Sequence, residues 1–242
     1  MTRRGTIGLL LAAGSSLLAG CDWIPSSDTI RYRVTVEVET PQGLRNGSSV
    51  IESTITTGKS WGDASGISYA LHGEAVAVDI APGQTVFALL RNVKNSDGAA
   101  YHAMLLSDAL RHGAAATPGF SKNYAGSSGG PFWKEQRSEA RRIKTTLGLP
   151  PQDYPLLVRF RNIHDPKSVE AVAPGDLAAS FGPGVRLRRI TVAVTDDAVT
   201  SGIEKRLGWL PSLHGSYLDG GSVGNAQNGG MHGGFFSSEP FK

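Results

Sequence analysis

The chain has 242 residues, with 24 Lys or Arg against 21 Asp or Glu, which gives a formal net charge of +3. This small excess excludes the strongly basic surface that is typical of nucleic-acid-binding proteins. The one cysteine excludes an internal disulfide, so the fold must be stable without one.

The first 20 residues have the pattern of a secretory signal peptide. Arg3 and Arg4 precede an uncharged run from Ile7 to Leu18. This run is shorter than the about 20 residues that a membrane-spanning helix needs. We therefore predict that residues 1–20 are removed, which leaves 22 basic against 21 acidic residues and an almost neutral domain.

The segment Leu18-Ala19-Gly20-Cys21 resembles the lipobox of bacterial lipoproteins, in which a peptidase cleaves before the cysteine. In that family the cysteine thiol carries a diacylglyceryl group and the new amino terminus is acylated. The resemblance implies stable attachment to membrane lipid through an acylated Cys21, because two or more acyl chains give stable attachment. An ordinary leader with an incidental cysteine is the alternative interpretation.

Asp22 resembles the signal that retains many lipoproteins in the inner membrane. The resemblance implies a location on the periplasmic side of the inner membrane, with the outer membrane as the alternative. Residues 21–29 are expected to form a lipidated tether, and residues 30–242 a single domain.

Strands dominate the first half of this domain. Residues 30–39 alternate between apolar and polar side chains, which is the period of a half-buried strand. A loop over Pro41–Ser49 is expected to lead to a second strand over Val50–Thr56. Residues 74–80 and 85–90 read as a hairpin joined by a tight turn at Pro82-Gly83.

Helices are expected in the middle of the chain. Apolar residues at helical spacing over 99–110 follow Asp97, a possible N-cap, and end at Gly113. A flexible loop is expected near residues 113–131, and a second helix over Phe132–Leu147.

The remaining chain returns to strands, over Leu156–Arg161 and Val185–Thr195. The second of these changes the parity of its apolar residues, which predicts a one-residue bulge at Arg188-Arg189. Ser201 and Glu204 have the spacing of a capping box for a short helix ending before Pro211. A Gly-rich C-terminal segment with at most one closing strand completes an α+β fold that is predominantly antiparallel β-sheet with two or three short helices.

Several of these segments are similar to a group of exported proteobacterial proteins that has no assigned activity. They include RYRVTVEVETPQGLRNGSSVIE, GEAVAVDI and YPLLVRFRNIHDPKSVEAV. The resemblance implies a shared fold and no particular reaction.

A serine nucleophile is the chemical alternative to a binding role. Residues 126–130 fit the G-x-S-x-G pattern around Ser128, but Ser127 stands where chymotrypsin-like proteases have Asp. The chain before Ser128 also lacks the strand that a hydrolase elbow requires. A Gly/Ser loop is the simpler interpretation, and we predict no catalytic residue.

No metal or other cofactor is expected. The six histidines show no metal-ligand spacing, and the single cysteine is assigned to lipid. These histidines are His72, His102, His112, His164, His214 and His232.

Four arginines form a candidate anion or headgroup patch. Arg159 and Arg161 share one face of their strand, as Arg186 and Arg188 do on theirs. If the two strands are neighbours, the four guanidinium groups gather on one sheet face and suit phosphate or carboxylate. The alternative is a solvated surface paired with acids such as Glu37 and Glu39.

The sequence thus predicts a membrane-anchored periplasmic lipoprotein that is a binding or scaffolding module at the cell envelope. The expected partners are membrane lipid through Cys21 and an envelope protein or anionic ligand, with no nucleic acid. An envelope hydrolase using Ser128 is the alternative.

Overall fold

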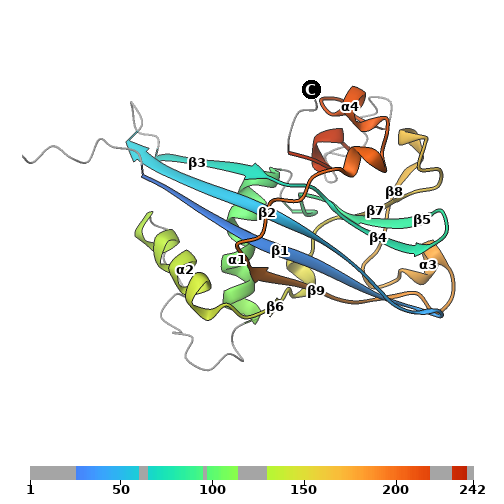
Figure 1. Ribbon diagram of the computed structural model, residues 1–242, viewed down its shortest axis with the longest axis horizontal. Coiled ribbons are helices and arrows are strands. Elements are labelled where there is room, and N and C mark those ends of the chain that lie inside the picture. The colour runs from blue at the N-terminus through green and yellow to red at the C-terminus, as the bar shows by residue number, and fades with distance from the viewer. Residues whose placement is uncertain (1–25, 60–64, 95–96, 114–129, 219–230, 239–242) are drawn as a thin grey trace, which may run out of the picture.

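The computed structural model of the chain (Figure 1) describes residues 26–59, 65–94, 97–113, 130–218 and 231–238. Nine strands form two antiparallel sheets within this part of the chain. The strands are β1 Ser26–Thr40, β2 Gly43–Lys59, β3 Ser65–His72, β4 Val76–Ala81, β5 Gln84–Ala88, β6 Leu147–Gly148, β7 Leu157–Phe160, β8 Val169–Ala171 and β9 Arg186–Val194. The helices are α1 Gly98–Gly113, α2 Gly130–Ile143, α3 Ala178–Phe181 and α4 Leu210–Leu213, with short 3₁₀ helices at Pro151–Asp153, Pro166–Ser168, Ile203–Lys205 and Gly233–Phe235.

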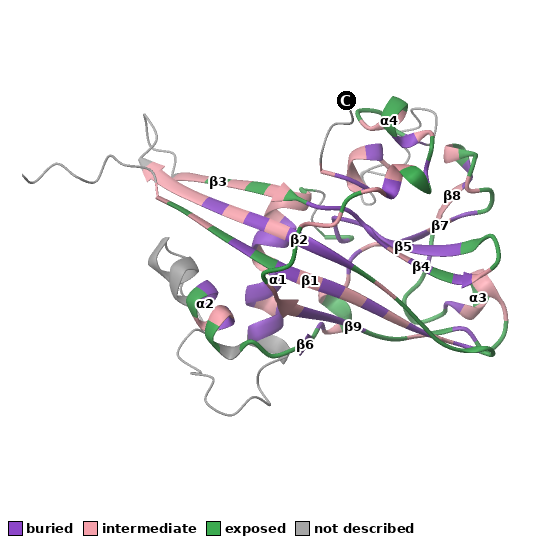
Figure 2. Ribbon diagram, in the orientation of Figure 1, coloured by how far each residue is buried: buried purple, intermediate pink, exposed green. Residues whose placement is uncertain are grey.

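Strand β1 is the centre of the larger sheet, whose strand order is β3-β2-β1-β9-β6. Its apolar residues from Ile30 to Val38 are buried, and the residues between them are intermediate or exposed, as the alternating bands in Figure 2 show. The sequence pattern therefore identified both the strand and its buried face. The predicted α+β fold, mainly antiparallel β-sheet, is confirmed.

The first two strands both begin earlier in the chain than predicted. β1 begins at Ser26 rather than at residue 30, because the hydroxyls of Ser27 and Thr29 each lie 2.8 Å from a threonine hydroxyl of β2. β2 begins at Gly43, so the predicted loop over Pro41–Ser49 is a two-residue turn. The Thr40 hydroxyl closes that turn by donating to the Gly43 carbonyl oxygen at 2.8 Å.

The smaller sheet has the order β4-β5-β7-β8 and packs against β1 and β2. The inner faces of both sheets and one face of α1 share the largest apolar core. The outer face of the smaller sheet carries a second core, closed by residues 203–218 and 231–236. The smaller sheet is therefore covered on both faces, whereas the larger sheet leaves its outer face to solvent (Figure 2).

Several local predictions hold. Helix α1 follows Asp97, whose carboxylate accepts the Ala100 backbone N–H at 3.1 Å, as an N-cap does. Helix α2 spans Gly130–Ile143, so the predicted end at Leu147 is wrong, because Leu147 lies in β6. β9 bulges at Arg188, since Glu37 faces Arg189 and Val38 faces Leu187. Residues 114–129, most of the predicted flexible loop, lie outside the described residues.

The predicted capping box is wrong. Ser201 makes no cap, and the turn at Ile203–Lys205 is a 3₁₀ helix. Instead, the Glu74 carboxylate accepts the backbone N–H groups of Gly202 at 2.9 Å and Ile203 at 3.0 Å. Pro211 also lies inside α4 rather than after a helix.

Candidate functional site

Three of the residues singled out by sequence lie outside the described part of the chain. They are Cys21 and Asp22 of the predicted anchor and Ser128 of the alternative hydrolase site. Their roles stay predictions, and no observation on the described residues favours the serine.

The four predicted patch arginines lie on strands of different sheets, so the condition that these strands be neighbours is not met. Arg159 of β7 and Arg161, the residue after that strand, both contact Glu170 of β8, at 2.9 Å and 3.1 Å. Arg159 also donates to the Ser180 carbonyl oxygen. These contacts neutralise part of the charge that the patch hypothesis requires.

Arg186 and Arg188 of β9 match the alternative interpretation, a solvated surface on which arginines pair with acids. Arg186 pairs with Glu39, and Arg188 lies 3.6 Å from a Glu37 oxygen, an ion-pair distance too long for a hydrogen bond. Arg189 makes the closer contact to Glu37, at 2.7 Å. The face therefore carries exposed cross-strand ion pairs, which stabilise proteins only weakly.

Among the described residues, no group of three or more His, Cys, Asp or Glu side chains could hold a metal ion. His102 instead lies on the buried face of α1. Its Nδ1 lies 2.7 Å from the Tyr32 hydroxyl, and burial lowers the pKa of His102 to about 3. The imidazole is therefore neutral at ordinary pH and has a structural contact.

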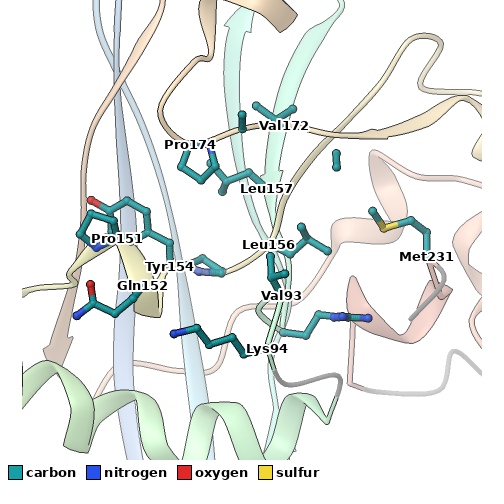
Figure 3. Close-up of a pocket in the computed structure, with 14 residues that line it drawn as sticks. Val93, Lys94, Pro151, Gln152, Tyr154, Leu156, Leu157, Val172, Pro174 and Met231 are labelled. Atoms are coloured by element: carbon teal, nitrogen blue, oxygen red, sulfur yellow. The ribbon is translucent and has the colours of Figure 1, made fainter. Parts of the chain in front are cut away.

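The feature with the properties of a binding site is a pocket of about 560 Å³ beside the smaller sheet (Figure 3). Its volume is within the 300–1,000 Å³ that ligand sites usually have. Most of its lining side chains are apolar, as in ligand sites generally. The 14 lining residues are Arg91, Val93, Lys94, Pro151, Gln152, Tyr154, Pro155, Leu156, Leu157, Ala171, Val172, Ala173, Pro174 and Met231.

Backbone hydrogen bonds fix the walls of this pocket. Leu156 donates its N–H to the Arg91 carbonyl oxygen at 2.8 Å and accepts from Leu89 at 2.9 Å. The 3₁₀ helix Pro151–Asp153 is held from the core side, because the Tyr101 hydroxyl donates to the Asp153 carbonyl oxygen at 2.9 Å. Pro151, Pro155 and Pro174 restrict the backbone further. The site is therefore preformed.

The polar groups of the pocket are few and include two cations. The Arg91 side chain is buried, with its guanidinium 4.8 Å from the centre of the Phe235 ring, and burial lowers its pKa. Lys94 is exposed, and its backbone N–H donates to the Asn92 side chain at 3.0 Å. In Figure 3 the Lys94 side chain points toward the side of the pocket where Gln152 lies, away from Pro174 and Val172.

Sequence reasoning missed this pocket because its walls are distant in the chain. The proline-rich run from Pro150 to Pro155 was the one local signal, since it predicts irregular but rigid backbone. Val93 gave no such signal, because its 57% exposure, unusual for a large apolar side chain, is seen only in the structure.

Comparison of the chain with models of known protein families, with curated protein sequences and with solved structures finds no match. Within the described residues, no helix has the length and apolar character needed to cross a membrane.

Proposed function

We propose that the protein is a lipid-anchored binding protein of the periplasm and that the apolar pocket is its ligand site. The observation that carries this proposal is the pocket itself, about 560 Å³ with mostly apolar walls. A preformed apolar site binds without first paying the entropy of ordering its walls. An apolar molecule, or the apolar part of one, is the class of ligand that fits.

The anchor supports the same function from the sequence side. Only residues 22–25 separate Cys21 from the first residue of β1, and four residues span at most about 14 Å. The Ser26 end of β1 therefore stays close to the bilayer.

The pocket is further from the anchor. Leu149 lies two residues before Pro151, which lines the pocket. Its N–H donates to the Ile190 carbonyl oxygen, and Ile190 pairs with Val36 on β1. Val36 lies ten residues along β1 from Ser26, or about 33 Å at the usual rise per residue. The fold therefore holds the pocket on the order of 30 Å along β1 from the anchored end.

The anchor is tested by mass spectrometry of the amino terminus of the protein isolated from membranes. We expect a chain that begins at Cys21 and carries acyl groups, and a Cys21→Ser variant without them. An unmodified Cys21, or cleavage at another residue, would contradict the anchored part of the proposal.

The pocket is tested with a neutral photoreactive hydrocarbon added to membranes that carry the full chain. We expect crosslinks within residues 151–157 and 171–174, and their loss in Ala173→Trp, which fills the pocket from an exposed lining position. Ala198→Trp is the matched control, because Ala198 is exposed and does not line the pocket. Equal labelling of these two variants would refute the site.

A further inference from the structure

The charge of the pocket lining is one-sided. Of its 14 residues, two are cationic, Arg91 and Lys94, and none is Asp or Glu. An apolar cation would therefore meet repulsion in the pocket, whereas an apolar anion would meet attraction.

The positive charge of Lys94 lies toward one end of the pocket. In Figure 3 the Lys94 side chain extends toward the end of the pocket where Gln152 lies, while Leu157, Val172 and Pro174 form the other end. An ammonium group and a side-chain amide are both hydrogen-bond donors that suit a carboxylate oxygen. One end of the pocket is thus suited to an anionic head, and the other to a hydrocarbon tail.

The donor end is held in place before any ligand arrives. The Asn92 side chain accepts the Lys94 backbone N–H at 3.0 Å, and the Arg91 Nε donates to the Asn92 carbonyl oxygen at 3.1 Å. This turn is joined to the pocket wall through the hydrogen bond from Leu156 to Arg91. Lys94 therefore extends from a fixed backbone, which lowers the cost of placing its charge beside a ligand.

We propose that the ligand is a long-chain carboxylate, an inference that rests on the proposed function. Its head lies at Lys94 and Gln152, and its tail lies against Leu157, Val172 and Pro174. A single ammonium beside an amide matches a head with one charge. A phosphate dianion usually engages arginine forks, whereas the Arg91 guanidinium packs over the Phe235 ring.

The test compares a diazirine-bearing long-chain carboxylate with its methyl ester, each titrated onto membranes that carry the full chain. We expect half-maximal labelling of residues 151–157 at a concentration about fivefold lower for the carboxylate, since a partly exposed ionic contact contributes modestly. The preference should disappear in Lys94→Gln and persist in Lys94→Arg. Lys167→Gln, which changes an exposed lysine outside the pocket, should match the unmodified chain.

The outcomes separate the two proposals. Equal labelling by carboxylate and ester, or a preference that survives Lys94→Gln, refutes the carboxylate and leaves the apolar site intact. Labelling of the pocket by neither probe refutes both. Displacement of the probe by anionic phospholipid vesicles, but not by unlabelled carboxylate, would identify a phospholipid as the occupant and overturn the inference.

Discussion

At the scale of single residues, Glu74 shows how one side chain joins two distant segments. Its carboxylate is buried, and burial raises its pKa even though two backbone N–H groups favour the charged form. The chain therefore tolerates a buried acid in order to satisfy the donors of Gly202 and Ile203.

We predict that Glu74→Ala lowers the free energy of unfolding by about 2 kcal/mol, because two largely buried N–H groups lose their acceptor. Ser201→Ala and Glu204→Ala, at the positions of the sequence-predicted capping box, should each change it by less than about 0.5 kcal/mol. Urea denaturation of the three variants measures these differences. A larger effect at Ser201 than at Glu74 would contradict the observed cap.

His102 gives a prediction about pH. Burial lowers its pKa to about 3, below the ordinary value of 6.5, so the unfolded chain binds the proton more readily. The free energy of unfolding must then fall as the pH falls from about 6.5 toward 3. This group contributes a slope of up to about 1.4 kcal/mol per pH unit.

The variant His102→Asn keeps a polar side chain near the Tyr32 hydroxyl but removes this titration. Between pH 4 and 6, its free energy of unfolding should depend less steeply on pH than that of the unmodified chain, although it starts from a lower value. Denaturation of both proteins at several pH values measures this difference. If the free energy of unfolding depends on pH equally in the two proteins, the buried neutral imidazole is contradicted.

At the scale of elements, the sequence predicted the features that depend on a local pattern of residues. The alternation in β1, the bulge at Arg188 and the N-cap of α1 were all predicted, because each depends on neighbouring residues. β3, the edge strand Ser65–His72, was missed although Ile67, Tyr69 and Leu71 alternate along it. The first part of β2 was read as a loop because Gly and Asn are rare in strands.

Gly47 explains why that part of β2 contains glycine. A Cβ atom at this position would overlap the carbonyl oxygen of Ala77, where β4 crosses β2. The two sheets approach closely here, and only a residue without a side chain allows the contact.

We therefore predict that Gly47→Ala lowers the free energy of unfolding by about 1–3 kcal/mol, the usual cost of forcing extra atoms into a packed interface. Gly148→Ala is the control, because nothing lies within 4 Å of a Cβ placed in that strand. Thermal unfolding of both variants gives the comparison, and similar midpoints would show that the sheets can separate at little cost.

At the scale of the whole molecule, the candidate site was beyond reach of sequence reasoning. The arginine patch failed as a single surface because parity along a strand says nothing about which strands are neighbours; β7 and β9 joined different sheets. The pocket depends on four segments brought together by the fold. What the sequence contributes at this scale is the predicted anchor, which lies outside the described residues.

The central claim is that the pocket holds an apolar ligand, and native mass spectrometry of the full chain isolated from its membranes tests it most directly. We predict one bound apolar molecule on the unmodified chain and on Ala198→Trp, and none on Ala173→Trp. The same bound mass on all three proteins, or on none of them, would contradict the claim.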